Sequence, residues 1–499
     1  MDDLEYLRAK GVFQLPSPAM RYKLLEGYFN LVHPCLPILD RAAILDSVQM
    51  TNGSSKISLL LFRCIMLSAR LFLDAYEGRR TRPATIRVMF DHARVLYDLG
   101  WETDRLTMLQ SLLLMTLHTQ PIDTPKGSLS LISQATSLAY VLGLHRDPVT
   151  VTHDTRERSL RKRTWWSLYI RERFIVLDHG SPWMIGEQDH EVPMLVLDDF
   201  VRDPLWPSLD TREIFAQHHD ASQQRKLALM FIERAKLATL IGQLSPISLR
   251  PYSTSNGVFE SNCAKIQQGP PVSTNLGKTG RDLDRFVANM PLELVYIETH
   301  GFKAAGSLRE NVLSFHYTAL MLLYHIATNH WAGLRWLEMS AMTADVSEAA
   351  VRTLWAATRP IINLVDGLMK EQSAAYCQLI TPSLIRPLLL CEMLNRDVPF
   401  WLTPSLDPSP IPALFARVGG ADVYFARGAC YNQQTSTRSP IHVSPTPSRE
   451  GPDLLASPTT STPLFDDILT DFPSTMHSMI SQVPLADEIL FALDGGTLC

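Results

Sequence analysis

The sequence predicts an all-α protein, in which a large helical body precedes a disordered tail that is first rich in Pro, Ser and Thr and then acidic. Three observations lead to this class. Apolar residues recur at helical spacing in many segments, and alternating β-branched runs that would indicate strands hardly occur. The composition changes abruptly after about residue 403. No fixed-period repeat is present, which disfavours a solenoid.

Helical segments follow one another from residue 17 to 244, after an N-terminal leader of residues 1–16, and resume from 282 to 402. The segment between them, residues 245–281, is polar and rich in Pro, Ser, Asn and Gly, as a linker or surface loop requires. The apolar spacing predicts individual helices over Met20–Leu31, Ile57–Tyr76, Pro83–Leu99, Leu106–His118, Gln224–Ile241, Leu308–Thr328, Ala349–Leu368 and Leu379–Leu394.

Residues 137–195 carry the clearest local signals. A helix is predicted to end at Gly143, which stands where a left-handed C-cap belongs. Asp154 or Thr155 can cap the next helix, whose broad apolar face includes the pair Trp165-Trp166. We expect this pair to be buried in the core and not to line a ligand pocket, because tryptophans on amphipathic helices are most often core residues.

Three parts of the sequence together resemble the middle homology region of fungal zinc-cluster (Zn2Cys6) transcription factors, nearest to the cutinase and xylanase-regulator-like branch. They are Tyr28–Arg41, the central runs Gly143–Pro148, Trp165–Arg173 and Asp189–Leu195, and finally His316–Tyr324. The resemblance spans most of residues 22–326. The motif residues that carry it are Gly143, Leu144, His145, Arg146, Trp165, Trp166, Asp189 and Pro193.

The resemblance implies a fungal-specific transcription factor domain, a helical regulatory domain whose two parts are residues 17–244 and 282–402. It implies a nuclear regulator of RNA polymerase II genes, specific for a pathway such as a biosynthetic cluster of secondary metabolism or a catabolic route. Its expected partners are coactivators of the transcription machinery and promoter DNA, bound directly or through a zinc-cluster partner, and the family allows homo- or heterodimers. The alternative is a transcriptional cofactor without its own DNA-binding module.

Members of this family usually carry six cysteines that bind two zinc ions, and we do not find that cluster in this sequence. No two of the cysteines form a C-x-x-C pair. They are Cys35, Cys64, Cys263, Cys377, Cys391, Cys430 and Cys499. We therefore expect no metal or other cofactor here, unless a missing exon or a partner supplies the zinc cluster. The acidic start, Met1–Glu5, and the net charge of −5 disfavour direct DNA binding.

Scattered cysteines and the lack of a secretory leader indicate a reducing compartment, in agreement with the nucleus. The most apolar run, Ile57–Leu73, is interrupted by Arg63 and Arg70, so we expect no membrane span. A basic run occupies residues 156–163. We expect it to be a solvated helix face, paired internally through Glu157 and Arg161, rather than a DNA contact; a nuclear-import signal is the second interpretation.

The tail is predicted to be disordered over residues 403–463, because Pro, Ser and Thr bury too little apolar surface to offset chain entropy. Residues 464–499 instead mix acidic with aromatic and aliphatic residues and contain no Lys or Arg, which is typical of an activation segment. The alternative is a final helix, Asp487–Leu493, that docks on the body. The candidate activation residues are Phe465, Asp466, Asp467, Ile468, Leu469, Phe472, Leu490 and Phe491.

No enzyme is expected. The run Gly277-Lys278-Thr279 lacks the first glycine of a phosphate-binding loop, His218-His219-Asp220 lacks zincin spacing, and no G-x-S-x-G is present. The sharpest rival is a helical metal-dependent enzyme, because Asp198 and Asp199 resemble the magnesium-binding aspartates of terpene synthases. No second metal motif follows on a later helix, so we expect these aspartates to lie in a solvated loop.

Overall fold

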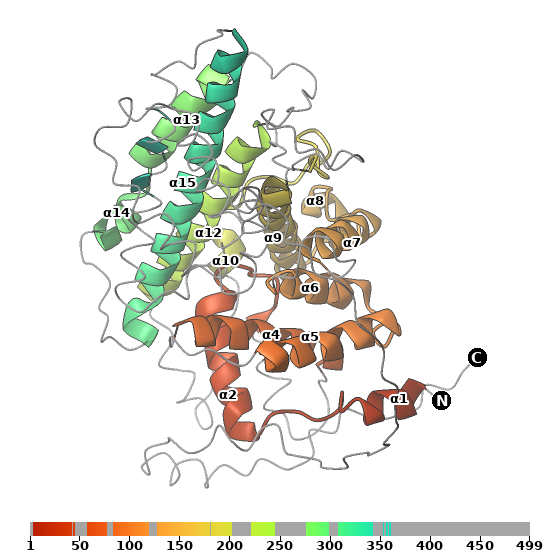
Figure 1. Ribbon diagram of the computed structural model, residues 1–499. Helices are drawn as coiled ribbons and strands as arrows, with labels where there is room; N and C mark the ends of the chain where they lie inside the picture. The colour runs from red at the N-terminus through yellow and green to blue at the C-terminus, as the bar shows by residue number, and fades with distance from the viewer. Residues whose placement is uncertain are drawn as a thin grey trace, which may run out of the picture.

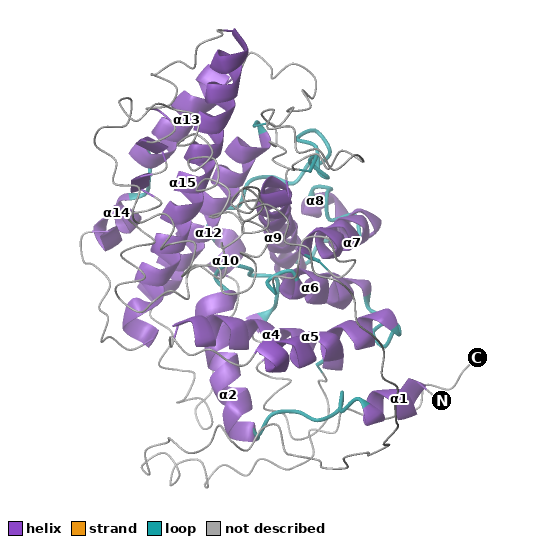
Figure 2. Ribbon diagram, viewed as in Figure 1, coloured by secondary structure: helices purple, strands orange, loops and turns teal. Residues whose placement is uncertain are grey.

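The computed structural model describes residues 3–44, 57–76, 83–118, 127–201, 221–244, 276–298 and 308–342, together with a few residues between 353 and 360; residues 42 and 180 are excepted. Helices are the only regular secondary structure in these ranges (Figure 2), so the predicted all-α class is confirmed. The predicted helix Leu379–Leu394 and the tail, residues 403–463 and 464–499, lie outside the described residues, as does most of Ala349–Leu368.

Most of the predicted helices that the structure describes begin and end within a few residues of the predicted positions, but the helix predicted over Leu308–Thr328 continues to Met342. The bounds of the described helices are α1 (Asp3–Ala9), α2 (Pro18–Gly27), the π-helix η1 (Tyr28–Val32), α4 (Leu59–Tyr76), α5 (Pro83–Asp98), α6 (Arg105–Met115), α7 (Ser128–Val141), α8 (Pro148–Val151), α9 (Thr155–His179), α10 (Asp198–Val201), α12 (Ala221–Gly242), α13 (Leu276–Ala288), α14 (Leu292–Glu298) and α15 (Leu308–Met342). No helix among them is long and apolar enough to cross a membrane.

Five of the described helices were not expected individually from the sequence: α1, the one-turn helices α8 and α10, and the helices α13 and α14. Helix α1 lies in the N-terminal leader, where acidic residues in its first turn favour the helix dipole and Leu7 is fully buried. Helix α13 begins at Leu276, so the predicted linker of residues 245–281 extends too far, and its last residues are helical. The glycines and the threonine of that run, Gly277 to Gly280, are poor helix formers, and tertiary contacts override their propensity.

The helices form one continuous hydrophobic core, with members from Leu7 in α1 to Ala327 in α15. In Figure 1, α4, α5 and α6 lie side by side in one half of the body, and the long helix α15 runs along α12, α13 and α14 in the other. Helix α9 lies between these groups, where it contacts α6 and α7 on one side and α12 on the other. The central motifs of the sequence therefore occupy the junction of the body.

Helix α13 packs closely on α15 because Gly280 has no side chain. A Cβ atom at this position would lie 2.6 Å from Cζ2 of Trp331, well inside van der Waals contact. The indole Nε1 of Trp331 donates a hydrogen bond of 2.8 Å to the carbonyl of Leu276, and the rings of Phe286 and Tyr324 stack at 5.8 Å. The close approach explains why a helix with two glycines is stable here.

We expect Gly280→Ala to lower the free energy of unfolding by about 1–3 kcal/mol, because the new methyl group overpacks the contact with Trp331. Gly277→Ala is the matched control in the same helix. Its Cβ would meet only the Arg281 side chain at 3.7 Å, so the change should be neutral or stabilise by at most about 1 kcal/mol. Thermal unfolding of the full-length chain checks both, and equal shifts for the two variants would contradict the close approach.

Candidate functional site

The first central motif is a helix-ending structure. Gly143 has a φ of +64°, in the left-handed region that its position requires. Its amide donates to the carbonyl of Tyr140, and the amide of Leu144 donates to that of Ala139, both at 3.0 Å. These two bonds define a Schellman motif, and Leu144 completes it by lying buried at 1% exposure. The predicted C-cap is confirmed.

Helix α9 begins after Asp154, whose carboxylate accepts a hydrogen bond of 2.9 Å from the amide of Arg156. This assigns the cap to Asp154 among the two predicted candidates. Trp165 and Trp166 are 0% and 2% exposed, and the indole of Trp166 donates to the carbonyl of Pro193 at 3.0 Å. Both tryptophans are core residues, as expected from the sequence.

The basic run at the start of α9 is less solvated than predicted. Lys162 and Arg163 are 9% and 5% exposed. The expected pair of Arg161 with Glu157 is present at 3.6 Å. Arg156 reaches much further along the chain, and its guanidinium contacts both carboxylate oxygens of Asp40 at 2.5 Å. The run therefore anchors α9 to neighbouring segments, because tertiary contacts supply acceptors that the sequence pattern does not reveal.

Asp198 is exposed as the sequence predicts, but Asp199 is not, and both lie in a helix where a loop was expected. They open the one-turn helix α10. The Asp199 carboxylate accepts a hydrogen bond of 2.7 Å from the ammonium group of Lys162 and one of 2.8 Å from the amide of Val196. These contacts explain why the Asp199 side chain is only 13% exposed. In the described part of the chain no three His, Cys, Asp or Glu side chains are grouped to hold a metal ion.

His190 lies against three aromatic side chains of α9. Its ring centroid is 5.4 Å from that of Trp165, 5.6 Å from that of Trp166 and 5.5 Å from that of Tyr169. Burial, with a further contribution from the charge of Arg173, lowers the pKa of His190 below its ordinary value. The ring is therefore held neutral within an aromatic setting.

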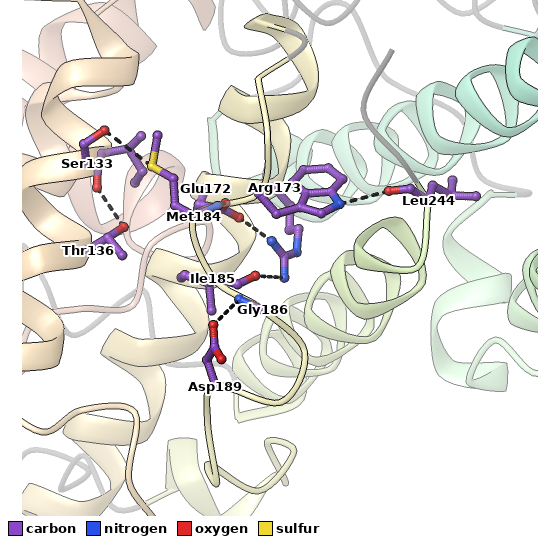
Figure 3. Close-up of polar contacts among 11 residues, drawn as sticks. Ser133, Thr136, Glu172, Arg173, Met184, Ile185, Gly186, Asp189 and Leu244 are labelled. Atoms are coloured by element: carbon purple, nitrogen blue, oxygen red, sulfur yellow. Dashed lines mark hydrogen bonds and ion pairs between the residues drawn. The ribbon is translucent and has the colours of Figure 1, made fainter. Parts of the chain in front are cut away.

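The motif residues His145, Asp189 and Arg146 have different roles. The carbonyl of His145 accepts a hydrogen bond of 2.8 Å from the amide of Glu191. This bond connects the cap of α7 to the extended segment that follows α9. Asp189 accepts 2.7 Å from the amide of Gly186 and closes a tight turn, which Figure 3 shows. Arg146 is exposed. Asp189 and Pro193 are exposed as well, so these three of the eight motif residues are open to solvent.

A fully buried ion pair lies beneath this turn. Glu172 and Arg173 are both 0% exposed, and the guanidinium of Arg173 lies 2.7 Å from the Glu172 carboxylate. Figure 3 shows how the backbone after α9 completes the pair: Arg173 also donates to the carbonyl of Ile185 at 2.7 Å, and Glu172 accepts from the amide of Met184 at 2.6 Å. Burial raises the pKa of Glu172, and the neighbouring guanidinium opposes that rise.

Aromatic faces and a glycine enclose the buried guanidinium. The charge of Arg173 lies 4.2 Å from the ring centroid of Tyr169 and 4.8 Å from that of Trp183, within cation–π range. The Trp183 indole donates 2.9 Å to the carbonyl of Leu244, just after α12. A Cβ at Gly242 would lie 3.0 Å from Nε of Arg173, so a larger residue there would crowd the pair.

Sequence reasoning did not single out Glu172, Arg173, Trp183 or Gly242 as functional positions. One signal for the first two was available, because a charged pair interrupts the broad apolar face of α9 between Tyr169 and Phe174. The partners of that pair come from a loop and from another helix, and no local pattern identifies them. The arrangement is suited to holding α9, the loop after it and the end of α12 in one fixed geometry.

The family described as the fungal specific transcription factor domain matches residues 25–284, just over half of the 499-residue chain. A protein named cutinase transcription factor 1 beta from Fusarium vanettenii is 34% identical over 52% of this chain and 31% of its own length. The transcription factor cpaR of Aspergillus oryzae is 34% identical over 48% of this chain and 41% of its own.

An acetamidase regulatory protein of Aspergillus fumigatus is 29% identical over 37% of this chain and 24% of its own length. The chain thus spans less than half the length of each of these three relatives. No solved structure matches it. The matched region includes the α7 cap, the α9 tryptophans and the buried ion pair, so the resemblance seen in the sequence falls on the junction of the helical body.

We expect Arg173→Met to lower the free energy of unfolding by about 3–5 kcal/mol, because it leaves the Glu172 carboxylate buried without its counter-ion. The matched control is Arg225→Met, which breaks an ion pair with Glu293 that is 53% and 43% exposed; its cost should be about 0–1 kcal/mol. Thermal unfolding measures both. Adding Glu172→Gln to Arg173→Met should recover part of the loss, and a further fall would contradict this account.

Proposed function

The chain belongs to the family of proteins with the fungal specific transcription factor domain, and on that premise we propose that it regulates transcription of RNA polymerase II genes in a fungus. The observation that carries the proposal is the family match over residues 25–284, which covers the packed junction around α9. The names of the relatives, a cutinase transcription factor and an acetamidase regulatory protein, support a pathway-specific set of target genes.

In this proposal the helical body acts as a scaffold and not through bond-making chemistry. The buried motif residues that the structure describes are engaged in caps, core packing and internal hydrogen bonds. Such interactions hold helices in one arrangement, which is what a regulatory domain needs in order to present a surface to a partner. The side chain of Arg146 is exposed and therefore accessible to a partner.

We assign activation to residues 464–499, which lie outside the described residues. Their mixture of acidic and apolar side chains suits a segment that folds onto shallow grooves of coactivators. The protein would act in the nucleus. Promoter DNA would be reached together with a zinc-cluster module, either on a partner or on a further segment of the protein.

Chromatin occupancy of the tagged protein in its native cells tests the regulatory class directly. We expect peaks confined to a set of promoters whose transcripts change when the gene is deleted. Absence of enrichment at every promoter, with the protein expressed and folded, would refute the proposal. Binding of the purified chain to the enriched promoters then separates direct DNA contact from recruitment by a partner.

The activation segment is tested by replacing Phe465, Ile468, Leu469 and Phe472 with alanine, which keeps every acidic residue. We expect most of the target transcript to be lost while promoter occupancy is unchanged, because the apolar side chains make the contact and the acidic ones keep them exposed. Alanine at Ser474, Thr475, Ser478 and Ser481 is the matched control and should have no effect. Equal transcript levels in both variants would assign activation elsewhere.

A further inference from the structure

A nucleophilic side chain lies where three distant parts of the chain meet. The sulfur of Cys35, just after η1, is 2.9 Å from Nη1 of Arg234 in α12 and 3.4 Å from Nδ1 of His316 in α15. Arg234 also donates 3.0 Å to the carbonyl of His316. The first and last motifs of the sequence therefore contact each other through this thiol, although they are 281 residues apart.

The hydrogen bonds around His316 determine which group carries each proton. Its Nε2 lies 2.8 Å from the carbonyl of Asn30 in the π-helix, and a carbonyl only accepts, so Nε2 carries the proton. Burial lowers the pKa of His316 to about 3, which keeps the ring neutral. Nδ1 is therefore an acceptor, and the thiol of Cys35 donates its proton toward it.

The guanidinium of Arg234 lies on the other side of the sulfur, and one of its N–H groups donates to the sulfur. Cys35 is also half-buried and not sealed in the core. Cys64, the other free cysteine that the structure describes, is 0% exposed, and burial raises its pKa to about 12. The two thiols therefore differ in their exposure and in the side chains that contact them.

A buried donor at this position has no acceptor. Arg234 is 3% exposed, and its Nε–H has no hydrogen-bond partner among the described residues. A buried donor without a partner is destabilising, so an acceptor added beside it would be stabilised. An oxygen atom bonded to the sulfur of Cys35 would provide that acceptor next to the guanidinium.

We propose that Cys35 is a peroxide-sensitive thiol whose oxidation loosens the contact between η1 and α15. The thiolate attacks one oxygen of hydrogen peroxide, so an S–O bond forms as the O–O bond breaks. The sulfur is oxidised by two electrons, and the peroxide is reduced. The leaving hydroxide combines with the proton released by the thiol to give water, and Cys35 becomes a sulfenic acid.

The oxidised sulfur can no longer make the same contacts. In the sulfenic acid the proton is on the new oxygen, so the sulfur of Cys35 no longer has a proton to donate to Nδ1 of His316, and the bond from this sulfur to α15 is lost. The new oxygen can accept a hydrogen bond from the guanidinium of Arg234 on α12, which already contacts the sulfur. The inference concerns the helical body alone and does not rest on the proposed function.

Peroxide treatment of the purified full-length chain, with a sulfenic-acid probe such as dimedone and peptide mass spectrometry, tests the chemistry. We expect Cys35 to be labelled at least about tenfold faster than Cys64 in the native protein. Both cysteines should be labelled at the same rate in the urea-unfolded chain. This control corrects for differences in how well the two cysteine-containing peptides are detected. Native Cys35 labelling as slow as that of Cys64 would overturn the proposal.

Hydrogen exchange tests the structural consequence. Peptides from the first half of α15, residues 308–328, should exchange severalfold faster after peroxide treatment of the wild-type chain. Cys35→Ser keeps a hydroxyl that can contact both neighbours but cannot be oxidised to a sulfenic acid, so it should not respond. Cys64→Ser is the matched control and should respond as the wild type does. An equal response in Cys35→Ser and wild type, or none in either, would exclude the switch.

Discussion

The buried ion pair of Glu172 and Arg173 constrains the structure more than any other interaction described. Both side chains are completely excluded from solvent, and removing ions from water costs several kcal/mol each unless their polar groups are satisfied. The Ile185 carbonyl accepts from Arg173 and the Met184 amide donates to Glu172, both from the loop after α9, whereas Nε of Arg173 has no hydrogen-bond partner among the described residues. The Trp183 face covers the guanidinium, and Gly242 leaves room for it. The loop and the end of α12 are therefore held where the pair requires them.

Helix α9 makes further buried and polar contacts with other segments along its length. In the first part of α9, Arg156 binds Asp40 and Lys162 binds Asp199. The two tryptophans that follow are buried in the core, and the ion pair lies further along the helix. One helix thus connects the N-terminal group of helices with α12, and through α12 with α15. The family motifs concentrate on this helix and its flanking turns because their residues make the connection.

The contact of Cys35, Arg234 and His316 completes the connection at the other side of α12. It depends on the π-helix η1, because the carbonyl of Asn30 in that turn orients the buried histidine ring. The described body therefore has polar contacts of two different kinds in its interior. The ion pair of Glu172 and Arg173 is completely buried, whereas the thiol of Cys35 is half-buried and can be reached by a small reagent.

The all-α class, the Gly143 cap, the Asp154 cap and the buried tryptophans could be predicted from the sequence, because periodicity and capping depend on neighbouring residues. The partners of Arg173, Lys162 and Cys35 could not be predicted, because they come from segments far along the chain. Helix α13 could not be predicted from the sequence either, because Gly280 is a poor helix former. The lack of a side chain at Gly280 matters only because Trp331 packs against it in the tertiary structure. The local pattern determined which helices form, and only packing decided which buried charges and thiols meet.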